Sequence, residues 1–256
     1  MLRAMISQDL HGRDKVTMAI QRLQMFEPPE GYFLADSGGK DSCCILELAK
    51  MAGVKFEAVY NVTTIDPPEL VQFIRKHHPE TRFSRPTMPF LRRLLEKGFP
   101  IRTKRWCCAE YKERSGSGRR VVTGIRWQES NRRKQRKMVE HCFRDKSKIY
   151  VNPIIDWSGA DVWSFIRQHK IPYCSLYDEG FKRLGCVMCP MNRRRKSEAK
   201  RWPKMERAFR RAFVKLYETH KGRPSYTAWQ SGDEMFDWWL SDKPSKKDSG
   251  QVVMFE

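Results

Sequence analysis

A strand, a glycine-containing loop and a helix follow one another in the stretch "YFLADSGGKDSCCILELAKMAG", residues 32–53. Its first residues form an apolar strand, and the apolar residues after the loop recur at helical spacing. The strand-then-helix order returns twice before residue 98, and a further strand, "RRVVTGI", follows. Such alternation is typical of parallel strands joined by crossover helices. The sequence therefore predicts an α/β fold with an open, mostly parallel sheet and helices on both faces.

The composition along the chain suggests four parts. Basic residues are dense after residue 190. Apolar residues recur among them at helical spacing, which predicts helices there. The predicted parts are a helical lead-in at 1–30, a nucleotide-binding domain at 31–190, a basic helical C-terminal extension at 191–240, and a flexible tail at 241–256.

The loop between the first strand and its helix predicts an anion-binding cradle. Two glycines allow backbone N–H groups to approach a phosphate, the helix N-terminus adds partial positive charge, and Lys40 adds a full charge. In an open α/β sheet, ligands bind at this carboxyl end of the strands. The alternative is a structural turn with an incidental lysine.

The hexapeptide "SGGKDS" resembles the motif of the PP-loop ATP pyrophosphatase superfamily, whose folds are HUP-like. The later blocks "TTIDPPEL", "GIRWQESNRR", "PIIDWSGADVWSFI" and "IPYCSLYDEGFKRLGCVMCP" are similar to those of its PAPS and APS reductase branch. The resemblance covers roughly residues 31–190. It implies an enzyme that binds ATP or a related adenine nucleotide with Mg²⁺, activates the α-phosphate and releases pyrophosphate.

The resemblance also implies residue roles. A guanidinium from "GIRWQESNRR" would lie over the α-phosphate, and its glutamate would orient that group or bind a metal. A surface ion pair and an exposed acid are the alternatives there, and a plain helix entry is the alternative for "TTIDPPEL". The expected catalytic residues are Lys40, Asp41, Arg126, Glu129 and Arg132. The expected nucleotide-binding residues are Ser37, Gly38, Gly39, Lys40, Asp41, Ser42, Thr64, Asp66 and Gly124, and Thr63 is a further candidate.

Four of the eight cysteines form a candidate metal-binding set: Cys107, Cys108, Cys186 and Cys189. A C-x-x-C turn directs two thiolates at one metal, and two more would complete a four-sulfur site. The spacing alone leaves zinc, an iron–sulfur cluster and a redox dithiol open. Side chains of adjacent cysteines diverge, which favours the separate iron corners of a cluster. The set is also similar to the cysteines that bind a [4Fe-4S] cluster in APS reductases and in the sulfurtransferase of DNA phosphorothioation.

The other four cysteines have weaker signals. Cys43 and Cys44 lie on the helix after the loop and are predicted to be core residues. Cys142 and Cys174 are candidates to carry a persulfide, although a lone cysteine is more often a small buried hydrophobe.

The charge points to a polyanionic partner. Lys and Arg number 50 against 30 Asp and Glu, which gives a net charge of +20. Such a surface attracts nucleic acid through counterion release, although a solvated basic surface is the alternative. Aromatic residues between the basic ones are candidates to stack on bases. These are Trp106, Trp127, Trp202, Tyr226 and Trp229.

The resemblance to sulfonucleotide reductases fails at one point. Those enzymes use a cysteine in a short C-terminal motif, and this sequence has no cysteine after Cys189. The expected reaction is therefore adenylation of a nucleic-acid oxygen, followed by displacement of AMP by sulfur from a donor such as a cysteine desulfurase. Two alternatives stay open: a sulfonucleotide reductase that uses Cys142 or Cys174 with thioredoxin, and a non-catalytic nucleic-acid-binding subunit with a structural cluster.

The last residues favour DNA over tRNA as the partner. "QVVMFE" resembles the peptide that binds the bacterial sliding clamp, with Gln251, Met254 and Phe255 at the matching positions. A final edge strand is the alternative. Nowhere do eighteen apolar residues run together, so we expect no membrane partner and a cytoplasmic location.

Overall fold

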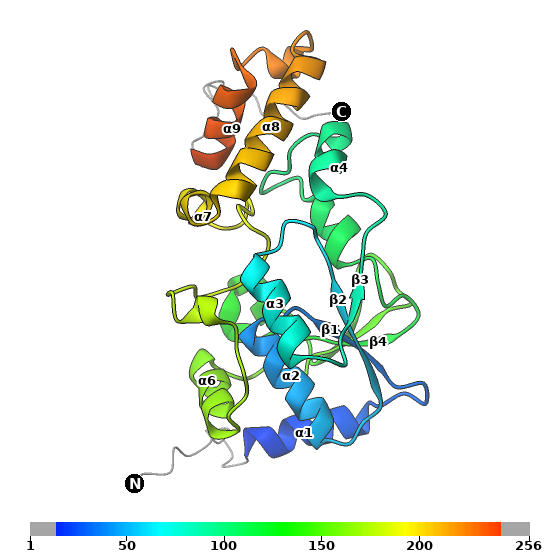
Figure 1. The fold of residues 1–256 in the computed structure, drawn as a ribbon. Helices are drawn as coiled ribbons and strands as arrows, with labels where there is room; N and C mark the ends of the chain where they lie inside the picture. The colour runs from blue at the N-terminus through cyan, green and yellow to red at the C-terminus, as the bar shows by residue number, and fades with distance from the viewer. Residues whose placement is uncertain (1–13, 242–256) are drawn as a thin grey trace. The chain divides into compact units, whose positions relative to one another are not determined.

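A computed structural model describes residues 14–241, which include a six-stranded sheet in the order β3-β2-β1-β4-β6-β5 (Figure 1). All neighbouring strands are parallel except β5 and β6, which are antiparallel. The predicted α/β fold with an open, mostly parallel sheet is confirmed. The strands are β1 (Tyr32–Asp36), β2 (Phe56–Asn61), β3 (Arg82–Ser84), β4 (Arg120–Val122), β5 (Val139–His141) and β6 (Ile149–Val151).

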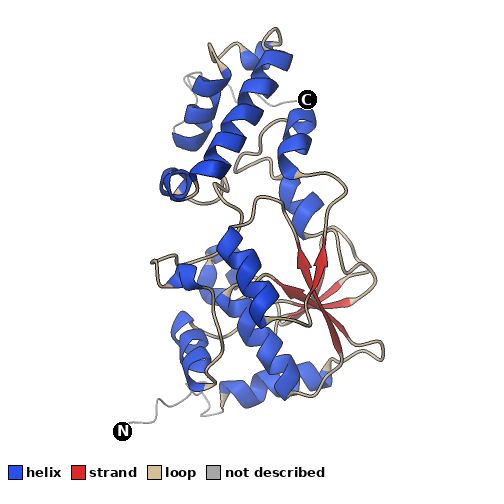
Figure 2. Cartoon of the chain, in the orientation of Figure 1, coloured by secondary structure: helices blue, strands red, loops and turns tan. Residues whose placement is uncertain are grey.

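Helices separate most of the strands along the chain (Figure 2). Single short turns, η1 to η4, occur in the connections. The α-helices are α1 (Lys15–Met25), α2 (Lys40–Met51), α3 (Pro68–His77), α4 (Phe90–Lys97), α5 (Asn131–Lys134), α6 (Gly159–Gln168), α7 (Arg195–Arg201), α8 (Pro203–His220) and α9 (Gly232–Ser241). The short turns are η1 (Cys108–Lys112), η2 (Trp127–Glu129), η3 (Ser175–Tyr177) and η4 (Pro224–Tyr226).

The described residues form two compact units, and each is assembled from three segments of the chain. The first, here called the sheet unit, comprises 14–62, 68–85 and 113–185 and contains all six strands. The second, the helical unit, comprises 63–67, 86–112 and 186–241 and contains α4, α7, α8 and α9.

In the sheet unit, the central strand β1 is buried on both faces because its residues alternate between them. Tyr32 faces α1, where its hydroxyl donates a hydrogen bond to the Leu23 carbonyl at 2.7 Å. On the opposite face Phe33 packs with Val121. There the chain at Gly116 comes so close that a Cβ atom on this residue would lie 2.9 Å from Val121 Cγ2. Because Gly116 has no side chain, its loop can pack directly against this face of β1 and β4.

In the helical unit, α8 supplies the core. Pro203 is its first residue, where a missing N–H costs nothing. The buried face of α8 carries Phe209 and Phe213, and both rings contact Trp239 of α9, with centroids 5.7 and 5.1 Å away. Aromatic contacts of this kind add to the burial of apolar surface. The sequence predicts helices for the basic segment 191–240, and α7, α8 and α9 lie there, in one compact unit with 63–67 and 86–112.

This core also uses most of the aromatic residues that the sequence offered for stacking on bases. Trp202 and Tyr226 are buried, so that prediction is wrong for them. Trp106 stacks on Phe90 with ring centroids 5.5 Å apart. Trp229 makes an edge contact with Phe99 at 5.9 Å. Trp127, in the sheet unit, is 41% exposed.

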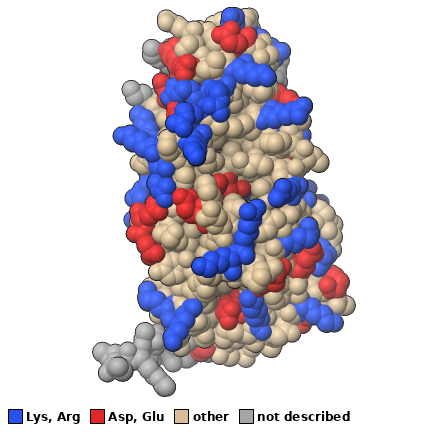
Figure 3. Space-filling model, in the orientation of Figure 1, with Lys and Arg blue, Asp and Glu red and all other residues tan. Residues whose placement is uncertain are grey.

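The surface in Figure 3 carries many Lys and Arg side chains, with Asp and Glu between them. In the part of the chain that the structure describes, no helix combines the length and apolar character needed to cross a membrane. The clamp-binding residues predicted at 251, 254 and 255 lie outside the described residues.

Candidate nucleotide site and cysteine pocket

The loop between β1 and α2 is anchored by a buried carboxylate, Asp36, whose side chain has no exposed surface. Its Oδ1 accepts hydrogen bonds from the Gly38 N–H at 2.8 Å and the Ser42 hydroxyl at 2.6 Å. Its Oδ2 accepts one from the Thr81 hydroxyl at 2.8 Å and lies 2.7 Å from His78 Nδ1. Burial alone would raise the pKa of Asp36, but these partners outweigh it and hold the pKa below its ordinary value.

Sequence reasoning missed the role of Asp36. The available signal was a charged residue at the last position of a strand otherwise made of buried apolar residues. Ser42, which was predicted to bind phosphate, also completes this anchor, because its hydroxyl accepts a hydrogen bond from the Ser37 N–H at 2.8 Å.

Two of the predicted glycines are required by close approach. Gly38 has a φ of 65°, and a Cβ atom on it would lie 2.6 Å from Ile74. Gly124, just after β4, brings the chain so close to the start of α2 that a Cβ atom would lie 3.0 Å from the Asp41 backbone. The strand end at Gly124 and the loop therefore meet in one place, as predicted from the parallel sheet.

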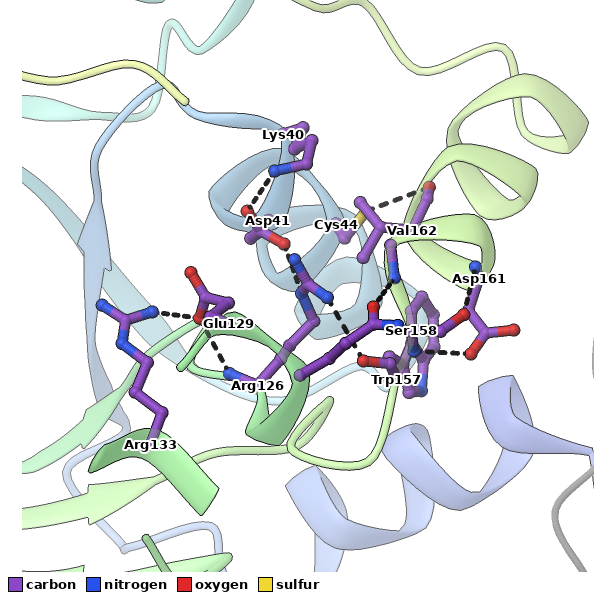
Figure 4. A network of polar contacts seen from close by, with 12 residues as sticks. Lys40, Asp41, Cys44, Arg126, Glu129, Arg133, Trp157, Ser158, Asp161 and Val162 are labelled. Atoms are coloured by element: carbon purple, nitrogen blue, oxygen red, sulfur yellow. Dashed lines mark hydrogen bonds and ion pairs between the residues drawn. The ribbon is translucent and has the colours of Figure 1, made fainter. Parts of the chain in front are cut away.

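A network of charged side chains lies at this meeting point (Figure 4). The Asp41 carboxylate bridges two cations, with Lys40 Nζ at 3.0 Å and Arg126 Nε at 2.6 Å. Arg126 is 4% exposed and also donates a hydrogen bond to the Trp157 carbonyl at 3.3 Å. Glu129 accepts the backbone N–H of Arg126 at 3.0 Å. The structure thus brings together four of the five predicted catalytic residues.

The fifth, Arg132, is exposed and forms no ion pair within residues 14–241. Its neighbour Arg133 pairs with Glu129 instead. Sequence reasoning missed Arg133, although Glu129 and Arg133 stand four residues apart, the spacing at which side chains meet along one helical face.

The loop also has an aromatic partner. The hydroxyl of Tyr177, in η3, accepts a hydrogen bond from the Lys40 N–H at 2.9 Å, and Lys40 Nζ lies 5.7 Å from the centre of its ring. Trp163 holds that ring with an edge contact at 5.2 Å. Burial raises the pKa of Tyr177, so the hydroxyl stays protonated at neutral pH. Tyr177 therefore occupies one of the loop N–H groups that a phosphate oxygen would use.

Tyr177→Phe is expected to tighten ATP binding by about twofold to tenfold, because a phosphate oxygen would no longer compete with the phenol oxygen for the Lys40 N–H. Isothermal titration with ATP measures the change. Tyr173→Phe, a more exposed tyrosine in contact with the same Trp163, is the control. Weaker binding by Tyr177→Phe would mean that the hydroxyl contacts the nucleotide itself.

The cysteines 107, 108, 186 and 189 all lie in the helical unit and line a single small cavity of about 20 Å³, roughly the space of one water. The Cys186 thiol donates to the Thr63 hydroxyl at 3.5 Å. Apolar side chains and Lys112 form most of the remaining wall. Besides the four cysteines the cavity is lined by Thr63, Ile65, Phe90, Pro100, Tyr111, Lys112, Val187, Met188, Pro190, Phe209 and Trp239.

Buried backbone contacts fix the C-x-x-C turn. The Val187 N–H donates to the Ile65 carbonyl at 2.9 Å, and the Met188 N–H donates to the Glu198 carboxylate at 2.7 Å. Met188 and Thr64 have φ values of 55° and 67°, in the left-handed region that side chains other than glycine seldom adopt. Strain of this kind persists where the surroundings over-determine a loop, and it is common at ligand-binding positions.

The donor set of this cavity fits a sulfur-ligated group. Four thiols face one apolar space that contains no carboxylate. Across residues 14–241, no three His, Cys, Asp or Glu side chains are arranged to hold a single metal ion. A cluster of four irons would give each thiolate its own metal and so does not require the four sulfurs to meet at one ion. The residues that would hold it are Cys107, Cys108, Cys186 and Cys189.

The first five residues of "TTIDPPEL", 63–67, lie in the helical unit. Asp66 accepts hydrogen bonds from the Thr63 N–H at 2.8 Å and the Thr63 hydroxyl at 2.7 Å. The Thr64 hydroxyl accepts one from the Phe90 N–H at 2.8 Å. These contacts build the turn before α3, which is the alternative to nucleotide binding left open by the sequence.

The remaining cysteines fall into two groups. Burial raises the pKa of Cys43 and Cys44 well above the ordinary value, in agreement with their prediction as core residues. Burial also raises the pKa of Cys174. For Cys142 burial acts in the same direction, but a hydrogen bond from the Tyr150 hydroxyl at 3.6 Å and nearby backbone N–H groups lower the pKa overall.

Cys142 is therefore expected to react with iodoacetamide at neutral pH at least about tenfold faster than Cys43, Cys44 or Cys174, because the thiolate is the reacting form. Peptide mass spectrometry over a time course measures the four rates. Tyr150→Phe should slow Cys142 alone. Equal rates at Cys142 and Cys174 would contradict the assignment.

Comparison with known proteins identifies the family. The model of the phosphoadenosine phosphosulfate reductase domain matches residues 31–192, well over half of the chain. The chain belongs to this family. All six strands, the Lys40 loop and all four cavity cysteines fall within the matched residues, whereas α1 precedes them and α7, α8 and α9 follow them.

Relatives of the phosphoadenosine phosphosulfate reductase domain agree with this placement. Two uncharacterized proteins of Methanocaldococcus jannaschii are 31% and 32% identical over 69% and 60% of this chain. The chain spans only about two fifths of their length, 41% and 40%. An adenosine 5'-phosphosulfate reductase of Bacillus anthracis is 28% identical over 61% of this chain and 74% of its own.

Among solved structures, the phosphoadenylyl-sulfate reductase of Candida auris in a phosphate complex is similar in fold. The TM-score is 0.51 at 18% identity, with 71% of this chain and 97% of that chain covered. At this identity the likeness bears on the fold alone.

Proposed function

We propose that this member of the family binds ATP at the Lys40 loop and transfers its adenylyl group to an oxygen of nucleic acid, with DNA favoured over tRNA. Pyrophosphate leaves in this step, and sulfur from a donor such as a cysteine desulfurase then displaces AMP. The protein is thereby a sulfurtransferase that modifies nucleic acid.

The observation that carries this proposal is the Asp41 carboxylate between Lys40 and Arg126 beside the glycine loop. In the absence of a phosphate, one carboxylate neutralises both cations. A triphosphate at the loop offers both cations stronger acceptors, so that Lys40 would bind the pyrophosphate end and Arg126 the α-phosphate. Asp41 and Glu129 would then orient the guanidinium or take part in binding Mg²⁺.

The reaction balances as two displacements at different centres. A nucleic-acid oxygen attacks the α-phosphorus of ATP, the bond to the bridging oxygen breaks, and pyrophosphate leaves. Hydrosulfide, released from the donor's persulfide by a thiol reductant that is oxidised to a disulfide, then attacks the adenylated centre, and AMP departs with the original oxygen. The loop N–H groups and the two cations stabilise the negative charge of the first step, which is the main contribution that a protein makes to such a transfer.

The cysteine cavity supports the second half of the proposal. Its four thiols would hold a [4Fe-4S] cluster, which when bound would supply a site for sulfur or electron chemistry. The protein's own residues would fix the thiols, because Glu198 and Ile65 hold the backbone of the C-x-x-C turn. An anaerobic preparation should show broad absorbance near about 400 nm, as thiolate-ligated clusters do. Zinc in place of iron would count against sulfur chemistry.

Reduction of a sulfonucleotide is the second candidate. The similarity to the Bacillus anthracis adenosine 5'-phosphosulfate reductase over 74% of its length favours it. Cys142, with its lowered pKa, would be the attacking thiol in that reaction.

Exchange of labelled pyrophosphate into ATP tests the first proposal. The exchange should require Lys40, be stimulated by DNA or tRNA, and fall by at least about a hundredfold in Lys40→Ala, as removal of a charge-stabilising group does. Lys76→Ala, at an exposed lysine of α3, is a control for loss of a cation outside the loop. The same preparations are given APS or PAPS with thioredoxin. Sulfite release abolished by Cys142→Ser, without exchange, would establish the second candidate instead.

A further inference from the structure

The exposed face of α8 carries a row of cations that the matched family residues do not include. Lys204, Arg207, Arg211 and Lys215 are all exposed and stand at positions i, i+3, i+7 and i+11. This spacing places them along one side of the helix over about 17 Å. We call these four residues the α8 cation ridge.

Other side chains of α8 contact the core or form ion pairs. The opposite side of α8 is buried through Phe209, Phe213 and Leu216. The nearby carboxylates are taken by Arg210, which binds Glu206 at 2.8 Å and two acids of α9. Those two are Asp233 at 3.0 Å and Asp237 at 2.9 Å.

Within residues 14–241, none of the four ridge residues forms an ion pair with a carboxylate. Figure 3 shows Lys and Arg gathered in the upper part of the view, over the part of the chain labelled α7 and α8 in Figure 1. Lys196 and Lys200 of α7 are exposed as well. Three acids of α8 and α9 thus bind Arg210, and Glu218 pairs with Lys221 at 2.7 Å, so the ridge is left to solvent.

This arrangement is unfavourable for the helix alone. Arg207 and Arg211, and again Arg211 and Lys215, stand four residues apart, where like charges repel. Lys204 lies in the first turn, where the helix dipole disfavours a cation. Solubility alone does not explain the row, because the same four charges spread over the surface would keep the protein equally soluble. A polyanion bound along the ridge offsets these costs, because it neutralises all four charges at once.

We propose that the α8 cation ridge binds the phosphate backbone of duplex DNA. This inference rests on the proposed function in one respect, that the substrate is nucleic acid. Single strands and RNA loops are bound largely by stacking on aromatic side chains. Trp202, two residues before Lys204 in the chain, is buried. A straight row of Lys and Arg without aromatic partners fits a continuous duplex backbone, which it contacts without reading the bases.

The test is a full-chain variant with Lys204→Gln, Arg207→Gln, Arg211→Gln and Lys215→Gln. Binding of a fluorescent 24-base-pair DNA duplex is measured by anisotropy at several salt concentrations without ATP. Each phosphate contact contributes about 0.9 to the slope of log K against log salt. The variant should therefore lose about 3 to 4 units of slope and at least about tenfold in affinity at low salt.

The control neutralises four exposed cations of the sheet unit, Lys55→Gln, Lys76→Gln, Arg167→Gln and Lys170→Gln. It changes the net charge equally, so it should leave the slope within about one unit of the wild type. Equal losses in both variants would overturn the proposal. Preferential binding of the wild type to single-stranded DNA, to tRNA or to anionic phosphatidylserine vesicles would also overturn it. Circular dichroism and thermal unfolding confirm that both variants fold.

Failure of the ridge is distinguishable from failure of the proposed function. If the ridge variant binds duplex DNA normally and still exchanges pyrophosphate, the ridge proposal alone falls. If the wild type binds duplex DNA through the ridge but never exchanges pyrophosphate, the adenylation proposal alone falls.

Discussion

Replacing Asp36 by alanine is expected to lower the free energy of unfolding by about 3 to 5 kcal/mol. The carboxylate is fully buried and satisfies Gly38, Ser42, Thr81 and His78 at once. Without it, buried donors remain that cannot reach water, and each costs more than the net gain of a typical hydrogen bond. Urea denaturation followed by circular dichroism measures the change.

Thr81→Val is the matched control for the Asp36 prediction. It removes one of the hydroxyl donors and keeps the carboxylate, so it should cost only about 1 kcal/mol. If Asp36→Ala costs no more than Thr81→Val, the carboxylate does not anchor the loop. Asp36→Ala should also weaken ATP binding, because the loop N–H at Gly38 loses its position.

The same residue predicts a pH dependence. The pKa of Asp36 in the folded protein lies below its ordinary value of 3.8. The folded state therefore holds this proton less readily than the unfolded state. The stability that Asp36 contributes is full above its ordinary pKa and is lost as the pH falls through the lower, folded pKa. Below about pH 4 the wild type should lose stability more steeply than Asp36→Asn.

The second large effect is expected at Arg126. Arg126→Leu should lower the free energy of unfolding by about 3 kcal/mol, because Asp41 would lose the closer of its two cations. This is the low end of the cost of breaking a buried ion pair, because the Asp41 side chain is 20% exposed and water can partly solvate its charge. Pyrophosphate exchange should fall by at least about a hundredfold if the guanidinium binds the α-phosphate.

A double-mutant cycle separates the two roles of Arg126. Arg126→Leu with Asp41→Leu should recover most of the lost stability, because apolar pairs of similar volume replace buried ion pairs at little cost. The exchange activity should stay low in the double variant. Recovery of exchange together with stability would show that Arg126 acts on the fold alone. Arg133→Leu, on the partly exposed Glu129 pair, should cost less than about 1 kcal/mol.

The parallel sheet and the loop geometry could be predicted from the sequence because their signals are local. Apolar strands, glycines and helical spacing each arise within a few residues, and the carboxyl ends of parallel strands must meet at one edge. Gly124 and Arg126, whose roles the family resemblance implied, follow β4 and lie beside the Lys40 loop in agreement with that rule. The sequence pointed to Arg132 and not to Arg133, because the difference depends on which face of a single helical turn meets Glu129.

The residues that the sequence did not reveal act over long separations in the chain. Asp36 meets Thr81 and His78 only after two crossovers, and Tyr177 reaches Lys40 from 137 residues away. The prediction that aromatic residues of the basic region stack on bases was wrong for another reason. Trp202 looks available for stacking in a basic segment, but the small helical unit needs large apolar side chains to build a core.

Attack at the α-phosphate is the central claim, and the fate of labelled ATP tests it most directly. ATP carrying ³²P in the α-phosphate is incubated with the anaerobic protein, Mg²⁺ and duplex DNA, then quenched and separated. We expect labelled AMP, free or transiently attached to the DNA, together with an equal amount of pyrophosphate, and neither product in Lys40→Ala. Label recovered in ADP with release of phosphate would show attack at the γ-phosphate instead.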